Sequence, residues 1–86
     1  IKDNQIFDFS GYNSDGIDIG ENSEDILISS NLIYHSQDKG ISVGQGSTVS
    51  LYRNLVEGCN SGIAVKDNSA AVVLNNTFFG SRLSLI

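Results

Sequence analysis

Apolar and polar residues alternate along this chain in short runs, separated by turns rich in Gly, Asn, Ser and Asp. Alternation with a period of two is typical of a β-strand with one buried face, and most of the alternating residues are β-branched. No stretch shows the three- and four-residue spacing of an amphipathic helix. The residues predicted to point inward are Ile17, Ile19, Ile26, Ile28, Ile33, Ile41, Val43, Val49, Leu51, Val56, Ile63, Val65, Ala71, Val73 and Phe78. The pattern therefore predicts an all-β fold.

The predicted strands recur in a repeat. The phrase Gly-Ile-x-Ile or Gly-Ile-x-Val starts at Gly16, Gly40 and Gly62, at intervals of 24 and then 22 residues. A second phrase, in which an apolar strand residue is followed three positions later by an Asn and then by two further residues, places Asn at intervals of 23 and 22 residues. Self-similarity at this period indicates a solenoid, in which each coil stacks on its neighbour.

We expect a single β-solenoid segment over residues 1–86, with three short strands per coil and about three and a half coils of 22–24 residues. A partial coil covers residues 1–14, and further coils begin near residues 15, 39 and 61. Coils of a parallel solenoid lie about 4.8 Å apart, so the segment would be about 15–20 Å tall. The chain contains no Pro, which suits strands that must all donate backbone hydrogen bonds. Because it opens and closes within the repeat, we expect a fragment of a longer solenoid.

One asparagine recurs at the same corner of every coil. The four members of this set are Asn4, Asn31, Asn54 and Asn76. Each side-chain amide can bond its counterpart in the adjacent coil while the backbone turns sharply. We interpret them as a structural ladder.

Charge and composition disfavour several functional classes. The formal net charge is −5, and the five Lys and Arg residues are dispersed, so no nucleic-acid partner is expected. No apolar run is long enough for a membrane-spanning helix, so no membrane partner is expected. The single cysteine, Cys59, is predicted to fill the core, and the single histidine, His35, to lie in a polar surface turn. With neither a second histidine nor a nearby cysteine, no metal site is predicted.

The repeat as a whole resembles that of right-handed parallel β-helix proteins of the pectate-lyase and polygalacturonase type, the pectin-lyase-like superfamily. The resemblance rests on Gly-Ile-x-Val, a polar turn, a short strand, and Asn followed by two hydrophobic residues. Residues 39–80 are similar to β-helix segments of bacterial surface or secreted proteins of unassigned role. The resemblance implies a right-handed, single-stranded parallel β-helix, and it suggests an extracellular or cell-surface location.

The segment Asn13-Ser14-Asp15-Gly16-Ile17-Asp18-Ile19 is similar to the Asn-Thr-Asp-Gly-Ile-Asp-Ile segment of polygalacturonases. The first Asp of that family segment is catalytic, so the resemblance would give this role to Asp15, with Asp38 in the same column one coil later. The family's neighbouring proton donor is replaced here by Lys39, and its His and Arg-Ile-Lys phrases are missing. A lysine beside two carboxylates favours their charged forms, whereas glycoside hydrolysis needs one protonated carboxyl group. Asp15 and Asp38 are the expected catalytic residues only if the chain is an enzyme.

A Ca²⁺-dependent lyase or epimerase is a second enzymatic reading. Asp15, Asp18 and Asp38 would supply oxygen ligands, and Lys39 or Arg53 would abstract a proton beside a uronate carboxylate. No spacing among these residues is diagnostic of a calcium site. We therefore expect no cofactor, with Ca²⁺ as the alternative.

An outward column is predicted three positions after each ladder Asn. Its members are Phe7, Tyr34, Glu57 and Phe79. Aromatic faces suit sugar rings, and a carboxylate can bond sugar hydroxyls, so this column is a candidate carbohydrate-binding surface. The alternative is that these side chains pack on a flanking segment or a partner.

A different outward set is apolar and comprises Leu27, Tyr52, Val72 and Leu74. Exposed apolar surface and open strand edges both favour association, so we expect a homo-oligomer formed by end-to-end or edge stacking. Ser42 is also predicted to point outward, and Ser42→Asp to be nearly silent.

Together these observations favour a non-catalytic β-helix module, structural or glycan-contacting, of an extracellular protein with a polysaccharide as its candidate partner. The alternative is a fragment of a polysaccharide-active enzyme, either a polygalacturonase-like hydrolase or a Ca²⁺-dependent lyase or epimerase.

Overall fold

The computed structural model describes residues 1–86 and consists of eleven β-strands joined by turns. The strands are β1 (Gln5–Phe9), β2 (Ile17–Ile19), β3 (Ile26–Ser29), β4 (Leu32–Ser36), β5 (Lys39–Val43), β6 (Thr48–Tyr52), β7 (Leu55–Glu57), β8 (Ser61–Val65), β9 (Ala70–Leu74), β10 (Thr77–Phe79) and β11 (Leu83–Leu85). No helix of a length and apolarity suited to crossing a membrane is present.

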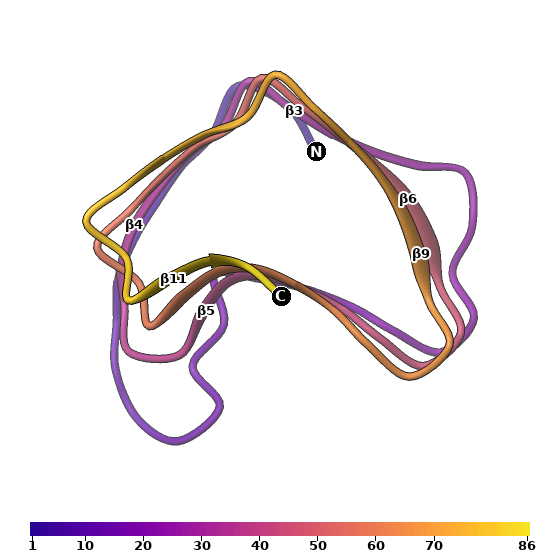
Figure 1. Cartoon of the computed structure of the whole chain (residues 1–86), viewed down its shortest axis with the longest axis horizontal. Coiled ribbons are helices and arrows are strands. Elements are labelled where there is room, and N and C mark those ends of the chain that lie inside the picture. The colour runs from indigo at the N-terminus through magenta and orange to yellow at the C-terminus, as the bar shows by residue number, and fades with distance from the viewer.

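The strands stack into three sheets that surround one interior (Figure 1). The sheets have the orders β1-β4-β7-β10, β2-β5-β8-β11 and β3-β6-β9. Every pairing is parallel, and each joins a strand to its equivalent in the next coil. The coil axis is the shortest dimension of the molecule, 19 Å, within the predicted height. The expected all-β parallel solenoid is confirmed.

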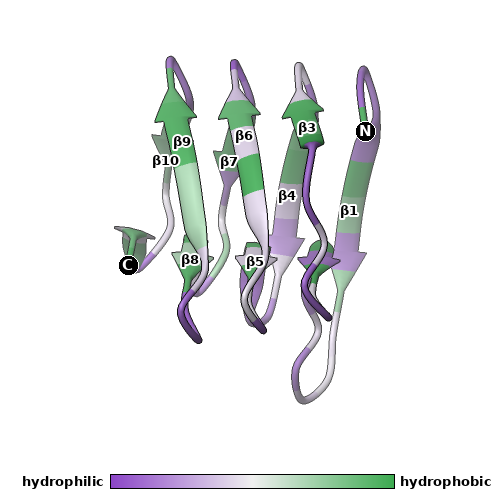
Figure 2. Ribbon diagram, turned by 90° about the vertical axis from the view of Figure 1, so that its right-hand side faces the viewer, coloured by the Kyte–Doolittle hydropathy of each residue, from purple (hydrophilic) through white to green (hydrophobic).

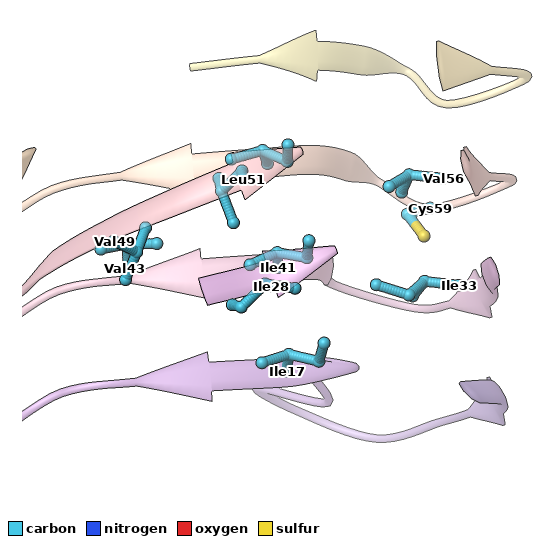
Figure 3. Packing of buried hydrophobic residues seen from close by; sticks show 10 residues of the cluster. Ile17, Ile28, Ile33, Ile41, Val43, Val49, Leu51, Val56 and Cys59 are labelled. Carbon is cyan, nitrogen blue, oxygen red and sulfur yellow. The ribbon is translucent and has the colours of Figure 1, made fainter. Parts of the chain in front are cut away.

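The interior is built from columns of aliphatic side chains, and each coil contributes one side chain to each column. Ile17 pairs with Ile41, and Ile41 pairs with Ile63. The first two lie directly one above the other in Figure 3. All residues predicted to point inward belong to the core cluster or pack against it. Cys59 is also in this cluster, and burial raises the pKa of its thiol, which makes it a less reactive group.

The glycine that opens each repeated phrase faces the core at a point where no side chain fits. A Cβ atom placed on Gly40 would lie 2.5 Å from Val56 Cγ1, and one on Gly62 would lie 2.6 Å from Phe78 Cδ1. Real Cβ atoms do not approach other atoms so closely, so the neighbouring sheet would have to move. The repeat therefore contains Gly because two sheets meet closely at this corner.

The asparagine ladder lies at a second corner. Asn31 donates its backbone N–H and its side-chain amide to Asn54 Oδ1, at 3.1 and 3.0 Å, and the same two bonds join Asn4 to Asn31 and Asn54 to Asn76. The residue before each ladder Asn has left-handed backbone, with φ of 55–58° at Asp3, Ser30, Arg53 and Asn75. This conformation is unfavourable for residues other than glycine, and here the ladder bonds hold it in place.

A serine ladder supports the third corner. Ser23 N–H donates to Ser47 Oγ at 3.1 Å, and Ser47 N–H donates to Ser69 Oγ at 3.0 Å. Ser47 is fully buried. These serines follow each other at the same 24- and 22-residue steps as the repeated glycines, so the pattern was present in the sequence although it was not predicted.

The first coil departs most from the common outline. Residues 10–16 and 20–25 bulge beyond the turns of the later coils (Figure 1). In Figure 2 the coils lie side by side, with the N-terminal coil at one end of the stack and the C-terminal coil at the other. The turns are short elsewhere, so the candidate functional surfaces are the outer faces of the sheets.

Candidate functional site

The outward column predicted on the first sheet is present and in register. Phe7 pairs with Tyr34, Tyr34 with Glu57, and Phe79 with Glu57. Phe79 is 68% exposed and Phe7 is 46% exposed, which is unusual for side chains of this size. Tyr34 and Glu57 are half-buried. We call these four residues the aromatic column.

The rings of Phe7 and Tyr34 are stacked, with centroids 4.9 Å apart and planes within 4° of parallel. Each of these rings therefore covers one face of the other. The second face of Tyr34 is directed along the column toward the coil that carries Glu57. Beyond Glu57, one further coil along, the column continues with Phe79.

A second outward column runs beside the aromatic column, with polar side chains in the first two coils and glycines in the two later ones. Asp8 and His35 form an exposed pair, with His35 Nδ1 3.2 Å from Asp8 Oδ1, and the His35 ring meets Tyr34 edge-on at 5.0 Å. The two later coils have Gly58 and Gly80 at the equivalent positions. All four have left-handed backbone. His35 lies within β4, between Tyr34 and Ser36, which pair with Phe7 and Phe9, and it is not in a separate turn as predicted. Because glycines follow His35, no side chain of this column flanks the later coils.

The two candidate catalytic carboxylates meet around a lysine. Lys39 Nζ lies 2.7 Å from Asp38 Oδ2 and 3.6 Å from Asp15 Oδ1. Asp15 Oδ1 also accepts the backbone N–H of Lys39 at 3.1 Å. The side chains are only 15%, 24% and 9% exposed for Lys39, Asp38 and Asp15, so this is a largely desolvated triad. The hydrogen bond from Lys39 to Asp38 raises the pKa of the lysine, the nearby carboxylates add to the increase, and desolvation opposes it.

The register of the second sheet changes the expected relation between the two carboxylates. Ile17 pairs with Ile41, which puts Asp15 level with Lys39 and leaves Asp38 one position earlier in the chain. The predicted placement of Asp15 and Asp38 in a single column was therefore wrong. It was based on the likeness to polygalacturonase segments, whereas the observed register follows from the aliphatic residues that stack inside.

In the triad, the carboxylates of Asp15 and Asp38 both form ion pairs with the Lys39 ammonium group. Glycoside hydrolysis requires a carboxyl group that can donate a proton to the leaving oxygen, whereas both carboxylates here lie against the Lys39 ammonium group. No three side chains among the histidine, cysteine, aspartate and glutamate residues are grouped so that they could hold a metal ion, and this includes the three aspartates considered as calcium ligands. Arg53, the other candidate base, lies 4.9 Å over the ring of Tyr52 at the end of β6, on a different sheet.

The outer face of the second sheet is concave, because the sheet bows toward the interior (Figure 1). Ser42 lies in this face, between Asp18 and Ala64 in the neighbouring coils. Ser42 is fully buried, and its hydroxyl has no hydrogen-bond partner. The expectation that Ser42→Asp is nearly silent assumed that Ser42 is exposed to solvent, and the burial of Ser42 contradicts that assumption.

The third sheet presents the apolar set. Leu27, Val72 and Leu74 are more than half exposed, whereas Tyr52 is half-buried. A shallow hollow of about 280 Å³ opens on this sheet. A smaller polar hollow of about 110 Å³ lies at the end of the second sheet, lined by Asp18, Ile19, Gly44, Gln45, Lys66 and Asp67. This hollow could not be predicted from the repeat, because four of its six lining residues lie in turns of two different coils.

The chain matches the protein family described as the right-handed β-helix region over residues 1–86, and it belongs to that family. The family assignment agrees with the parallel three-sheet coil and fixes its hand as right-handed. Neither the comparison with curated proteins nor the comparison with solved structures finds a match.

Proposed function

We propose that this chain is a non-catalytic β-helix module that contacts glycans through the aromatic column. The observation that carries the proposal is the in-register aromatic column on the first sheet, in which Phe7 and Phe79 are exposed. Exposed apolar side chains that lie next to one another often mark an interaction surface, and aromatic faces pack well on the C–H faces of sugar rings.

The aromatic column places a carboxylate among the rings. Glu57 pairs with Tyr34 on one side and with Phe79 on the other. Its side chain supplies acceptors for the hydroxyls of a sugar that lies against the neighbouring rings. A neutral, hydroxyl-rich sugar therefore suits this surface better than an acidic one.

The closed triad argues against catalysis as the main activity. Lys39 occupies both carboxylates, so the chain has the family's scaffold with a cation in place of the proton donor. With polygalacturonate or alginate, with and without Ca²⁺, we expect neither new reducing ends nor unsaturated products. Products that disappear in Asp15→Ala or Asp38→Ala would establish the enzymatic alternative instead.

Binding is tested by isothermal titration calorimetry with xylo-, cello- and galacturono-oligosaccharides. We expect the neutral oligosaccharides to bind, and Phe79→Ala to weaken them about 3- to 10-fold through the loss of one stacking contact. Val72→Ala is the matched control, since it truncates an equally exposed apolar side chain on another sheet. Absence of binding to every sugar, or an equal effect of the control variant, would refute the proposal.

A further inference from the structure

One nitrogen of the His35 ring is held by Asp8 and the other is free. Nδ1 of His35 lies 3.2 Å from Asp8 Oδ1, and the ring forms no other hydrogen bond within the chain. Because a carboxylate can only accept, Nδ1 carries the proton in this pair and Nε2 is left without a partner. The His35 side chain is 58% exposed, so a ligand can reach the ring from solvent.

Gly58, in the following coil, makes room for the imidazole. A Cβ atom placed on Gly58 would lie 3.0 Å from Cδ2 and 3.7 Å from Nε2 of His35. The Cδ2–Nε2 edge of the ring therefore occupies the space that a side chain at position 58 would need. The free nitrogen thus lies beside the coil that carries Glu57, the residue that pairs with Tyr34.

The second face of Tyr34 is directed toward the same coil. Phe7 covers the first face, with centroids 4.9 Å apart, and the His35 ring stands at 85° to the Tyr34 ring with centroids 5.0 Å apart. The imidazole is therefore a side wall of the aromatic column at the point where Tyr34 and Glu57 succeed each other. An aromatic face, a carboxylate and a free ring nitrogen meet there.

The backbone shows that the coil does not require a side chain at this position. Asp8, His35, Gly58 and Gly80 have φ of 61°, 59°, 64° and 68°. Glycine adopts this left-handed conformation freely, whereas other residues are disfavoured in it. Because the two later coils have glycine, the Asp8–His35 pair is not needed for the winding of the chain, and it lies in a disfavoured conformation that often accompanies a functional role.

We propose that His35 is a specificity-determining residue of the aromatic column, an inference that rests on the glycan-binding function proposed above. Its Nε2 forms a hydrogen bond with a hydroxyl at the edge of a neutral sugar ring that packs on the second face of Tyr34. Asp8 and Gly58 are positioning residues, since Asp8 holds the proton on Nδ1 and Gly58 leaves space for the ring. An acidic sugar is disfavoured, because its carboxylate would lie near those of Asp8 and Glu57.

Nuclear magnetic resonance tests the free nitrogen directly. His35 is the only histidine of the chain, so the imidazole signals in a long-range proton–nitrogen spectrum of isotopically labelled protein belong to it. We expect a protonated Nδ1 in the free chain and a shift of the Nε2 signal when cellohexaose is added. An unprotonated Nδ1 in the free chain, or an Nε2 signal that bound cellohexaose leaves unchanged, would overturn the inference.

Substitutions separate the imidazole from the carboxylate that positions it. His35→Gly removes the ring and suits the left-handed backbone, so the chain should stay folded and bind cellohexaose about 3- to 10-fold more weakly, the effect of one hydrogen bond. Asp8→Gly should also weaken binding. Asp8→Asn keeps an acceptor for Nδ1–H and should bind within about twofold of the unchanged chain. Equal losses in Asp8→Gly and Asp8→Asn would contradict the positioning role.

Two glycines of the second column provide a matched pair of variants. Gly58→Ala puts a methyl group against the imidazole and should weaken binding as His35→Gly does. Gly80→Ala introduces the same unfavourable backbone conformation, but its methyl group would meet only Gly58 N, at 3.9 Å, so binding should be unchanged. Circular dichroism verifies the fold of each variant, and calorimetry measures cellohexaose binding. Equal effects of the two variants would overturn the role of Gly58.

Failure of this inference and failure of the proposed function give different results. If cellohexaose binds and Phe79→Ala weakens it while His35→Gly does not, His35 has no part in specificity and the glycan-binding function stands. If the unchanged chain binds no sugar, the proposed function fails and the inference fails with it, even when Nδ1 carries the proton.

Discussion

Equivalent residues of the middle and last coils differ greatly in burial. Ile41 is fully buried in the second sheet, whereas Leu85, at the same position two coils later, is 49% exposed. The sequence pattern treats the two alike, since both are aliphatic residues of the same phrase. The difference teaches that in a solenoid the energetic weight of a position comes from having a coil on each side, and the pattern alone cannot report it.

The largest expected loss of stability comes from placing a charge at the buried position of this pair. Ile41→Asp puts an unpaired charge into the centre of the stack, and the combined loss of apolar burial and of charge solvation should exceed the stability of so small a chain. Leu85→Asp keeps its carboxylate in water and should cost less than about 1 kcal/mol. Thermal unfolding followed by circular dichroism distinguishes them, and equal losses would show that the faces are wrongly assigned.

The asparagine ladder gives the next largest contrast. Asn54 is 1% exposed and accepts two bonds from Asn31, so Asn54→Ala leaves buried donors unpaired and should cost about 3 kcal/mol. Asn4→Ala, at the exposed end of the ladder, should cost about 1 kcal/mol or less. Urea unfolding of both variants measures the difference, and a larger loss for Asn4→Ala would contradict the ladder's role.

The triad provides a prediction of intermediate size. Lys39→Met leaves two poorly solvated carboxylates side by side and should destabilise the fold by about 2 kcal/mol. Lys66→Met, at an exposed lysine, should change stability by less than about 0.5 kcal/mol. The measurement is the free energy of unfolding at pH 7, and indistinguishable values for the two variants would rule out a structural role for the triad.

The same lysine sets a dependence on alkaline pH. Its folded-state pKa is raised above the ordinary 10.5, so its contribution is complete below pH 10.5 and is lost as the pH rises through the raised value. Lys39→Met should therefore flatten the fall of stability above pH 10.5. Part of the fall should remain from about pH 9.0, because the pKa of Cys59 is also raised and its unfolded form ionises first. An unchanged alkaline profile would count against the ion pairs.

The smallest expected change in stability is at Ser42, which points outward and yet is buried. Ser42→Ala removes a buried hydroxyl that has no partner, so it should leave the fold unchanged or stabilise it by up to about 1 kcal/mol. Ser42→Asp should destabilise it, because the new carboxylate would be enclosed in the concave face. Differential scanning calorimetry resolves a shift in either direction. Greater stability of the Asp variant would show that this face is open.

Most of the interior was predictable, because a two-residue alternation and a 22- to 24-residue period together specify which side chains stack. The position of each strand within a coil followed from residues such as Ile28, Leu51 and Val73. The reason for Gly40 did not, since it depends on how close the second sheet approaches Val56. The serine ladder had the same periodicity but consists of a residue so common in turns that its spacing carried little weight.

The outer surface was less predictable, for physical reasons that differ from place to place. The alignment of Phe7, Tyr34, Glu57 and Phe79 followed from their constant distance to the ladder asparagines. The burial of Ser42 depends on sheet curvature, which alternation does not encode. Asp15 lies level with Lys39 because the stacked aliphatic residues inside set the register of the second sheet. The resemblance to polygalacturonase segments instead placed Asp15 level with Asp38, one position earlier in the chain.

The left-handed corner before each ladder asparagine has a consequence for how such a chain can diversify. Its backbone is held by the amide that follows, so the identity of the corner residue matters little, and the four coils use Asp, Ser, Arg and Asn there. Along this edge the exposed corner residue of each coil can be acidic, neutral or basic. New surface chemistry can arise there without any change to the winding of the chain.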